Sequence, residues 1–245
     1  MKLLCISLGC DKNLVDAERM LGSLSQDGYT FTDDEQEADV ILVNTCCFIN
    51  DAKEESIQTI LELAELKKTG QLKALIVAGC LAQRYQAEIQ KEIEEVDAII
   101  GTTAYESIAE VADEILGGKE QVKQLESIDL AMQDGNGKLR VLSTAPYFAY
   151  LKISEGCDNR CTYCVIPQMR GRHRSRELES LVEEATLLAQ QGVKELVIVA
   201  QDTSIYGRDL YGKPMLDELL RRLNAIEGLE WIRLLYAYPE TLTEE

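Results

Sequence analysis

The feature that most constrains the fold is an alternation of short apolar segments with longer segments of helical periodicity. In the first half of the chain the apolar segments span 3–8, 40–43, 74–78 and 98–100, and each is followed by apolar residues at helical spacing. Strands that alternate with helices form parallel sheets with helices on their faces. The alternation therefore predicts an α/β fold whose N-terminal part is an open parallel sheet with flanking helices.

A change in composition predicts the domain boundary. The last helical pattern of the first half ends at Gly117-Gly118, and a polar stretch with the turn-forming run Asp-Gly-Asn-Gly follows. We therefore predict an N-terminal domain over 1–117, a connector over 118–143 and a second domain over 144–245.

The second domain repeats the strand–helix alternation. Its apolar segments span 147–153, 196–200 and 231–235, with helical patterns between them. The series stops at Glu245 without a terminating signal, so we interpret this domain as the first part of a partial TIM-type (β/α) barrel and the chain as truncated.

Charge and cysteine content narrow the classes of function. The chain has 25 Lys and Arg against 43 Asp and Glu, a net charge of -18, which disfavours a nucleic-acid partner. No apolar run approaches the roughly 20 residues that cross a bilayer, and no signal-peptide pattern begins the chain, which predicts a cytoplasmic protein without a membrane partner. With one histidine and 8 cysteines, the metal or nucleophilic chemistry is expected to depend on thiols, because disulfides are rare in that compartment.

Three cysteines lie in one short loop after the segment 147–153. Cys157, Cys161 and Cys164 have the spacing C-x3-C-x2-C, which can ligate three irons of a four-iron cluster and leave the fourth iron open. The alternative is a closed structural zinc site completed by His173. The loop lies where α/β barrels place their chemistry, which favours the cluster.

Three further cysteines each follow a different predicted strand of the N-terminal sheet. Cys10, Cys46 and Cys80 occupy equivalent positions after these strands, whose carboxyl ends lie at one sheet edge where ligands bind. Taken singly, each is typical of a small buried apolar residue. Taken together, they predict a second cluster. Cys47 is an alternative ligand to Cys46, and Cys5 is interpreted as a core residue.

Short motifs around these cysteines resemble those of the radical S-adenosylmethionine (SAM) methylthiotransferases over essentially the whole chain. The motifs are Ser7-Leu8-Gly9-Cys10-Asp11-Lys12-Asn13, Asn44-Thr45-Cys46, Gly79-Cys80, Lys152-Ile153-Ser154-Glu155-Gly156-Cys157, Gln201-Asp202-Thr203-Ser204 and Tyr206-Gly207. Lys12-Asn13 followed by Val15-Asp16 is more similar to the branch that modifies an aspartate of the small-subunit ribosomal protein S-twelve than to the tRNA-modifying branch. Asp11 departs from the proline that is usual in the first branch.

The resemblance implies an enzyme with two 4Fe-4S clusters and SAM as cofactors, the clusters being held by the two cysteine sets. One SAM would give the radical that abstracts hydrogen from the aspartate β-carbon, the Cys10, Cys46 and Cys80 cluster would present sulfur, and a second SAM would supply the methyl group. Radical chemistry of this kind is carried by cofactors. An external flavodoxin-like or ferredoxin-like protein would donate electrons. The family's later barrel strands and small C-terminal β-barrel are absent, so activity of this segment alone is not assumed.

The resemblance also implies roles for residues outside the cysteine sets. Tyr163 matches the aromatic position near the adenine of SAM, with a residue of the barrel wall as the alternative. Arg176 ends a basic run with Arg170, Arg172 and Arg174 and is the candidate for the SAM carboxylate, although such a run is also typical of a solvated surface. Gln201 and Asp202 are candidate cofactor contacts or a plain strand-ending turn.

One candidate residue and the alternative functions remain to be named. Lys12 adjoins the first cysteine motif and is a candidate residue near the sulfur donor, or a surface residue at a helix start. The leading function is methylthiolation of the ribosomal protein, and the alternative enzyme is a tRNA adenosine methylthiotransferase. The alternative of another class is a non-catalytic iron–sulfur electron-transfer or structural metal module, whose irons would all be ligated. An open iron would distinguish the enzymes from it.

Overall fold

The computed structural model describes residues 1–70, 72–132 and 140–241. The chain divides into two compact units. Unit 1 consists of Met1–Ile128 with Leu139–Val141, and unit 2 of Asp129–Lys138 with Leu142–Glu245. None of the helices in the described ranges has the length and apolar character needed to cross a membrane.

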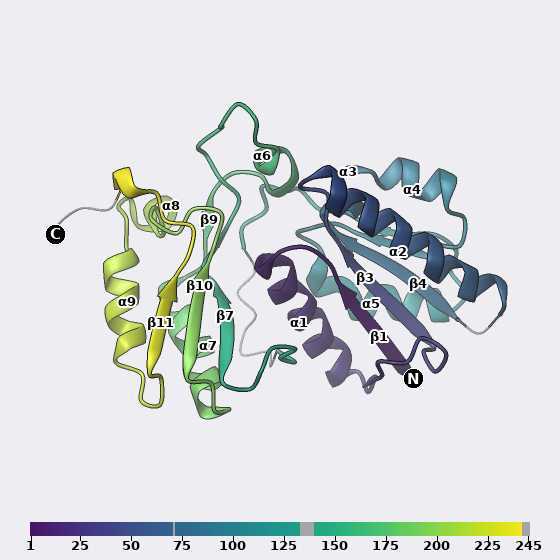
Figure 1. Cartoon of the computed structure of the whole chain (residues 1–245), viewed down its shortest axis with the longest axis horizontal. Helices are drawn as coiled ribbons and strands as arrows, with labels where there is room; N and C mark the ends of the chain where they lie inside the picture. Colours follow the sequence, from purple (N-terminus) through teal and green to yellow (C-terminus); the bar gives the residue numbers. More distant parts are fainter. Residues whose placement is uncertain (71, 133–139, 242–245) are drawn as a thin grey trace. The chain divides into compact units, whose positions relative to one another are not determined.

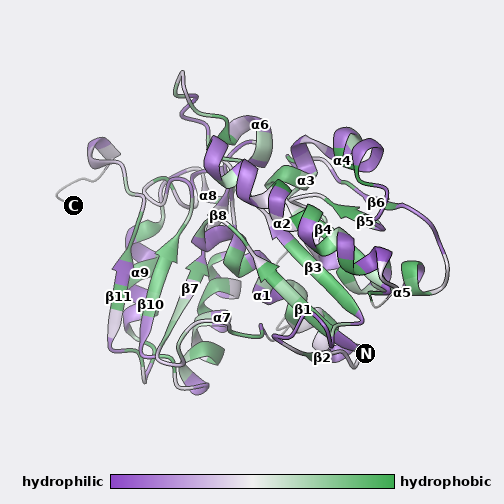
Figure 2. Cartoon of the chain, turned by 45° about the vertical axis from the view of Figure 1, so that its right-hand side comes forward, coloured by the Kyte–Doolittle hydropathy of each residue, from purple (hydrophilic) through white to green (hydrophobic). Residues whose placement is uncertain are grey.

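Unit 1 is built on a six-stranded parallel sheet (Figure 1). The strands, in sheet order, are β2 (Thr30–Phe31), β1 (Lys2–Ser7), β3 (Val40–Thr45), β4 (Ala74–Gly79), β5 (Ala98–Ile100) and β6 (Val122–Gln124). Every residue of β3 and β4 is buried, as expected for central strands covered on both faces. Figure 2 draws these two strands mainly in the hydrophobic colour. The predicted open parallel sheet is confirmed.

Two strands of this sheet have no counterpart in the sequence analysis. β2 has two exposed residues and β6 has one buried residue among its three, so neither contains an apolar run. β6 pairs with β5 in parallel and lies inside the range 118–143 that was predicted as a connector. Such short segments become strands because a neighbouring strand offers them hydrogen-bonding groups, which periodicity alone does not reveal.

Helices flank the sheet of unit 1 on both faces. They are α1 (Asp11–Gln26), α2 (Asn50–Lys68), α3 (Cys80–Arg84), α4 (Gln86–Glu92), the 3-10 turn η1 (Tyr105–Ser107) and α5 (Ile108–Leu116). One core cluster joins apolar residues of α1 and α5 to inward residues of the strands, among them Leu24, Leu42, Ile76 and Ile108, all with zero exposure. This packing fixes where each strand ends relative to its neighbours.

Unit 2 contains a three-stranded parallel sheet in the order β11-β10-β7. Its elements are β7 (Phe148–Lys152), β8 (Ser154–Glu155), α6 (Ile166–Arg170), β9 (Arg174–Ser175), α7 (Leu178–Gln190), β10 (Glu195–Val199), α8 (Arg208–Tyr211), α9 (Leu216–Asn224), β11 (Trp231–Leu234) and the 3-10 turn η2 (Pro239–Thr241). β8 and β9 pair in antiparallel fashion beyond the end of β7. The strand–helix series confirms the expected first part of a barrel.

Candidate functional site

The cysteine set of unit 1 lies at the carboxyl ends of three adjacent strands. The pairing register places Ser7 beside Asn44 and Thr45 beside Gly79, so β1, β3 and β4 end almost level. Cys10 precedes α1 as its N-cap, Cys46 follows β3 directly, and Cys80 is the first residue of α3. The predicted placement of Cys10, Cys46 and Cys80 on one sheet edge therefore corresponds to the strand register observed.

The loop that carries Cys10 lies directly against Cys46. A Cβ atom on Gly9 would lie 2.6 Å from Cys46 Cβ and 2.8 Å from Cys46 Sγ, and Gly9 has a φ of +93°. Both the close approach and the left-handed backbone require glycine at this position. The Cys46 thiol is thus directed at the Cys10 loop. Ser56 Oγ accepts the Cys46 N–H at 3.0 Å and donates to the Cys46 carbonyl at 2.9 Å, which fixes the backbone of Cys46.

The Cys157 loop of unit 2 is held against the residues that lead into β9. The Cys157 N–H donates to the Gly171 carbonyl at 3.2 Å, and the Cys164 N–H donates to the Cys161 carbonyl at 2.9 Å. Cys157 is buried, whereas Cys161 and Cys164 are half-buried. Burial raises the pKa of the Cys157 thiol. Cys161 Sγ lies 4.0 Å from the Tyr238 hydroxyl.

A buried charge cluster lies immediately before this loop, and the sequence analysis assigned it no role. Glu155 Oε2 accepts from Lys152 Nζ at 3.0 Å and from Arg170 Nη1 at 2.8 Å, while Glu155 Oε1 accepts from the Gly156 N–H and from Gln201 Nε2. Burial alone would raise the pKa of Glu155, but Arg170 and Lys152 outweigh it and hold that pKa well below its usual range. The available signal was a carboxylate directly before Gly156 and Cys157.

Gln201 and Asp202, which follow β10, lie beside the same loop. Asp202 is buried and accepts from Asn159 Nδ2 at 2.9 Å and from the Ser204 hydroxyl at 2.5 Å, so it ties the β10 end to the Cys157 loop. Gln201 Oε1 is buried and, within the described residues, has no hydrogen-bond partner. This oxygen is an acceptor that a donor group of a ligand would satisfy.

The basic run differs from a solvated surface. Arg170, Arg174 and Arg176 are buried, and only Arg172 of the four is exposed. Arg176 pairs with Glu184 at 2.7 Å and donates to the Lys152 carbonyl at 3.2 Å and to Ser180 Oγ at 3.1 Å. The surface interpretation is therefore wrong for three of the four arginines, because the β8–β9 pairing and α7 cover them.

Tyr163 and Lys12 have opposite environments. The Tyr163 side chain is 89% exposed and therefore offers a free aromatic face. Lys12 is buried to 7% exposure and its Nζ pairs with Asp11 at 2.9 Å. Lys12 thus lies beside Cys10 as a shielded ion pair rather than as a solvated residue.

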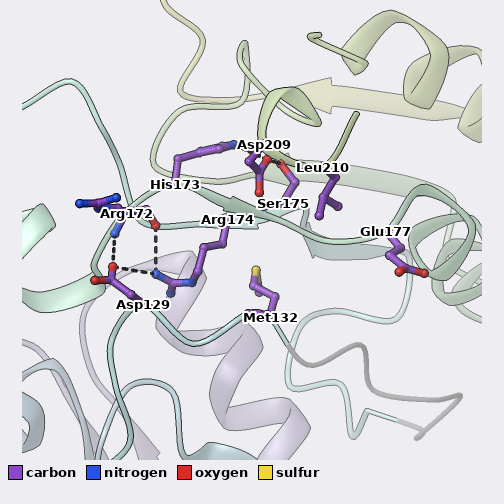
Figure 3. A pocket seen from close by; sticks show the side chains of 10 residues that line it. Asp129, Met132, Arg172, His173, Arg174, Ser175, Glu177, Asp209 and Leu210 are labelled. Atoms are coloured by element: carbon purple, nitrogen blue, oxygen red, sulfur yellow. Dashed lines mark hydrogen bonds and ion pairs between the residues drawn. The ribbon is translucent and has the colours of Figure 1, made fainter. Parts of the chain in front are cut away.

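A cavity of about 490 Å³ in unit 2 is lined by His173, Ser175 and Asp209, whose side chains contact one another (Figure 3). His173 Nε2 lies 3.1 Å from Ser175 Oγ, and Ser175 Oγ donates to Asp209 at 2.6 Å. The serine hydroxyl therefore donates to the carboxylate. In a nucleophilic triad the serine hydroxyl instead donates to the imidazole, and the carboxylate accepts a hydrogen bond from the other ring N–H. This trio does not have the arrangement of a hydrolase.

The single histidine allows a direct test of burial in this cavity. Burial lowers the pKa of His173 below its usual value of 6.5, while Asp209, Asp202 and Asp158 partly oppose this shift. Folding disfavours the protonated imidazole of His173. At pH values above the pKa of His173 in the unfolded chain, the neutral ring therefore contributes its full stabilisation. This stabilisation is lost as the pH falls through the lower pKa of the folded chain. Proton NMR should give one imidazole titration with a midpoint below 6.5, rising when urea unfolds the chain. A folded midpoint at or above 6.5 would contradict this assignment.

The cysteine thiols are the candidate ligands of both predicted clusters. All eight cysteines lie in the described ranges and are free thiols. Over those same ranges, no three Cys, His, Asp or Glu side chains are grouped closely enough to hold one metal ion. A four-iron cluster places each thiolate on a different iron and so needs its ligands spread apart.

Comparison with known proteins identifies two family regions. Residues 2–101 match the uncharacterized protein family UPF0004, and residues 151–245 match the radical SAM superfamily. The chain is 58% identical to the ribosomal protein uS12 methylthiotransferase RimO of Lachnoclostridium phytofermentans, covering 100% of this chain and 55% of the relative. It is 55% identical to the protein of the same name from Clostridioides difficile, covering 100% and 54%. The chain thus spans about half the length of these relatives.

Solved structures show the same fold at low sequence identity. The radical SAM methyltransferase TsrM of Kitasatospora setae superposes with a TM-score of 0.55 at 16% identity, over 90% of this chain and 50% of that one. The cobalamin-dependent SAM radical enzyme OxsB superposes with a TM-score of 0.52 at 12% identity, over 91% and 36%. The two solved structures are thus similar to this chain in fold. Along its whole length the chain is similar to the uS12 methylthiotransferases, which confirms the resemblance predicted from the motifs.

Proposed function

We propose that the chain is the N-terminal part of a radical SAM methylthiotransferase that inserts sulfur at the β-carbon of an aspartate of ribosomal protein uS12 and methylates that sulfur. The observation that carries this proposal is the pair of cysteine sets, each at the carboxyl end of a parallel sheet in its own unit. The 58% identity to a uS12 methylthiotransferase supports the choice of substrate.

Two clusters and SAM supply the chemistry that side chains lack. A β-carbon C–H bond has no proton acidic enough for a side-chain base, and a cofactor-derived radical overcomes that limit. Cys157, Cys161 and Cys164 would hold the cluster that leaves an iron open to SAM. The second cluster would be held by Cys10, Cys80 and Cys46, the last preferred to Cys47 because its thiol is directed at the Cys10 loop.

The environments of the other candidate residues suit some of them, but not all, to contact a cofactor. Gln201 offers a buried acceptor without a partner among the described residues, which suits the ammonium group of SAM, and Asp202 anchors the loop beside it. Tyr163 offers an exposed ring for the adenine. Lys12 would place a positive charge beside the sulfur site. Arg176 is left out of the proposed contacts because its guanidinium is buried against Glu184.

The proposed reaction sets the wider context of the chain. Reduction of the open cluster needs an external flavodoxin-like or ferredoxin-like donor, and a ribosomal substrate places the enzyme in the cytoplasm. We keep the division into domains at 1–117 and 144–245, which the matched regions 2–101 and 151–245 support. The tRNA substrate is the competing hypothesis, and the -18 net charge disfavours it.

Substrate identity is tested in a strain that lacks the full-length gene. We expect the methylthio mass increment to be lost from the uS12 aspartate and retained on tRNA adenosine, because the sequence is similar to uS12 enzymes over its whole length. Mass spectrometry of both molecules from the same cells gives the answer. Complementation with the full-length gene is the control. Loss of the tRNA modification with intact uS12 would overturn the substrate assignment.

A further inference from the structure

We propose that Asn13 is a positioning residue that holds the loops of Cys10, Cys46 and Cys80 together before any cluster is bound. The inference concerns the chain itself, and its link to a cluster rests on the proposed function. Asn13 is on the first turn of α1 and has zero exposure. A fully buried side-chain amide must find its hydrogen bonds within the protein.

The Asn13 amide has only one orientation that satisfies its neighbours. Its Nδ2 donates to the Leu8 carbonyl at 3.1 Å and to the Thr45 carbonyl at 2.9 Å. Carbonyl oxygens only accept, so the NH2 group must face these two atoms and Oδ1 must face away from them. Oδ1 then lies 3.8 Å from Cys80 Sγ, where the thiol can donate to it. One side chain thus contacts the segments that precede Cys10 and Cys46 and the third cysteine directly.

A second asparagine strengthens the same junction. Asn44 Nδ2 donates to the Asn13 carbonyl at 2.7 Å, and Asn44 is itself 1% exposed. A Cβ atom on Gly79 would collide with Asn44 Oδ1, and Gly79 has a φ of +92°. Only glycine at that position lets the β4 end approach Asn44 and the Thr45 backbone this closely. The junction therefore joins the ends of β1, β3 and β4 by side-chain hydrogen bonds that the sheet itself does not provide.

Loss of the Asn13 amide should act on these loops rather than on the whole unit. Alanine at this position removes the donor from the buried Thr45 carbonyl and from the part-buried Leu8 carbonyl, which favours opening of the loops to water. The apolar face of α1, with Val15, Met20 and Leu24, is unchanged by the substitution and continues to pack on the sheet. The expected result is local opening with the core intact.

Thiol labelling of the metal-free whole chain tests this step directly. Short pulses of iodoacetamide, mapped by mass spectrometry, should label Cys46 and Cys80 about tenfold faster in Asn13→Ala than in the wild type. Cys5 in β1 is the internal control, since burial raises its pKa to about 12 and it packs against the core. Unchanged labelling of Cys46 and Cys80, or a parallel rise at Cys5, would overturn the proposal.

Two matched variants separate hydrogen bonding from shape. Asn13→Asp keeps the shape of the side chain but removes the amide donor, so it should expose Cys46 and Cys80 as Asn13→Ala does. Wild-type labelling in Asn13→Asp would show that shape alone matters and would overturn the proposal. Asn224→Ala, at the exposed end of α9 in unit 2, should leave every labelling rate unchanged.

Anaerobic iron reconstitution connects the junction to the proposed cluster. Asn13→Ala is expected to bind about half of the wild-type iron, because the Cys157 set is unaffected and each four-iron cluster holds the same number of irons. Full iron loading in this variant would overturn the role of Asn13 in cluster binding. If the wild type itself holds only one cluster, the proposed second cluster fails, while the labelling result still decides whether Asn13 positions the thiols.

Discussion

Replacing Cys157, Cys161 and Cys164 together by alanine should remove about half of the reconstituted iron and abolish reductive cleavage of SAM. The two cysteine sets belong to separate compact units, so each cluster is expected to assemble without the other. Iron and acid-labile sulfide analysis would measure the first effect. Chromatographic detection of 5'-deoxyadenosine from the full-length enzyme under anaerobic reduction would measure the second.

The reciprocal variant is the matched control for this experiment. Alanine at Cys10, Cys46 and Cys80 should also remove about half of the iron, but 5'-deoxyadenosine should still form while no sulfur is inserted. The radical would then arise with no sulfur held near the substrate. Loss of all iron in either triple variant would contradict independent assembly, and methylthiolated product from the reciprocal variant would require a different sulfur site.

Glu155→Gln should lower the free energy of unfolding of unit 2 by about 3–5 kcal/mol, because removing one partner leaves buried charges uncompensated. Lys152 and Arg170 both direct a cation at Glu155 Oε2, and the side chains of all three residues are at most 4% exposed. The substitution also weakens the acceptor of Gln201 Nε2, which donates to Glu155 Oε1. Urea unfolding followed by circular dichroism would measure the change in free energy. The fluorescence of the single tryptophan, Trp231 of β11, would report on unit 2.

A surface carboxylate provides the comparison for this effect. Glu218 pairs with Arg222 at 3.0 Å on α9, with both side chains more than a third exposed. Exposed pairs of this kind contribute about 0–1 kcal/mol, so Glu218→Gln should change the stability little. Equal effects of the two substitutions would show that the Glu155 cluster is not an energetically coupled buried site.

The cysteine sets were predictable because their placement follows local rules. The C-x3-C-x2-C spacing is a property of one loop, and the carboxyl ends of neighbouring parallel strands meet at one edge by topology. Cys10, Cys46 and Cys80 could therefore be grouped without knowledge of any side-chain contact. Cys46 was preferred to Cys47 as the first residue after Asn44-Thr45, and the structure adds that its thiol lies against Gly9 of the Cys10 loop.

The roles of the charged residues were not predictable in the same way. In the sequence, Arg170, Arg174 and Arg176 were compatible with a solvated surface run or with binding of an acidic group, and the structure shows that each is buried. Whether a charge is buried depends on which distant segments cover it and which opposite charges meet it. Arg176 pairs with Glu184 of α7, and Arg170 pairs with Glu155 of β8.

The sequence by itself determined the strand–helix alternation, the parallel sheets and the two cysteine sets, because apolar periodicity and residue spacing are encoded within single segments. Tertiary structure alone decided the edge strands β2 and β6, the Glu155 charge cluster and the Asn13 junction. Each of these depends on polar groups from segments far apart in the chain reaching hydrogen-bond distance. Such meetings are set by strand register and packing, which no local pattern specifies.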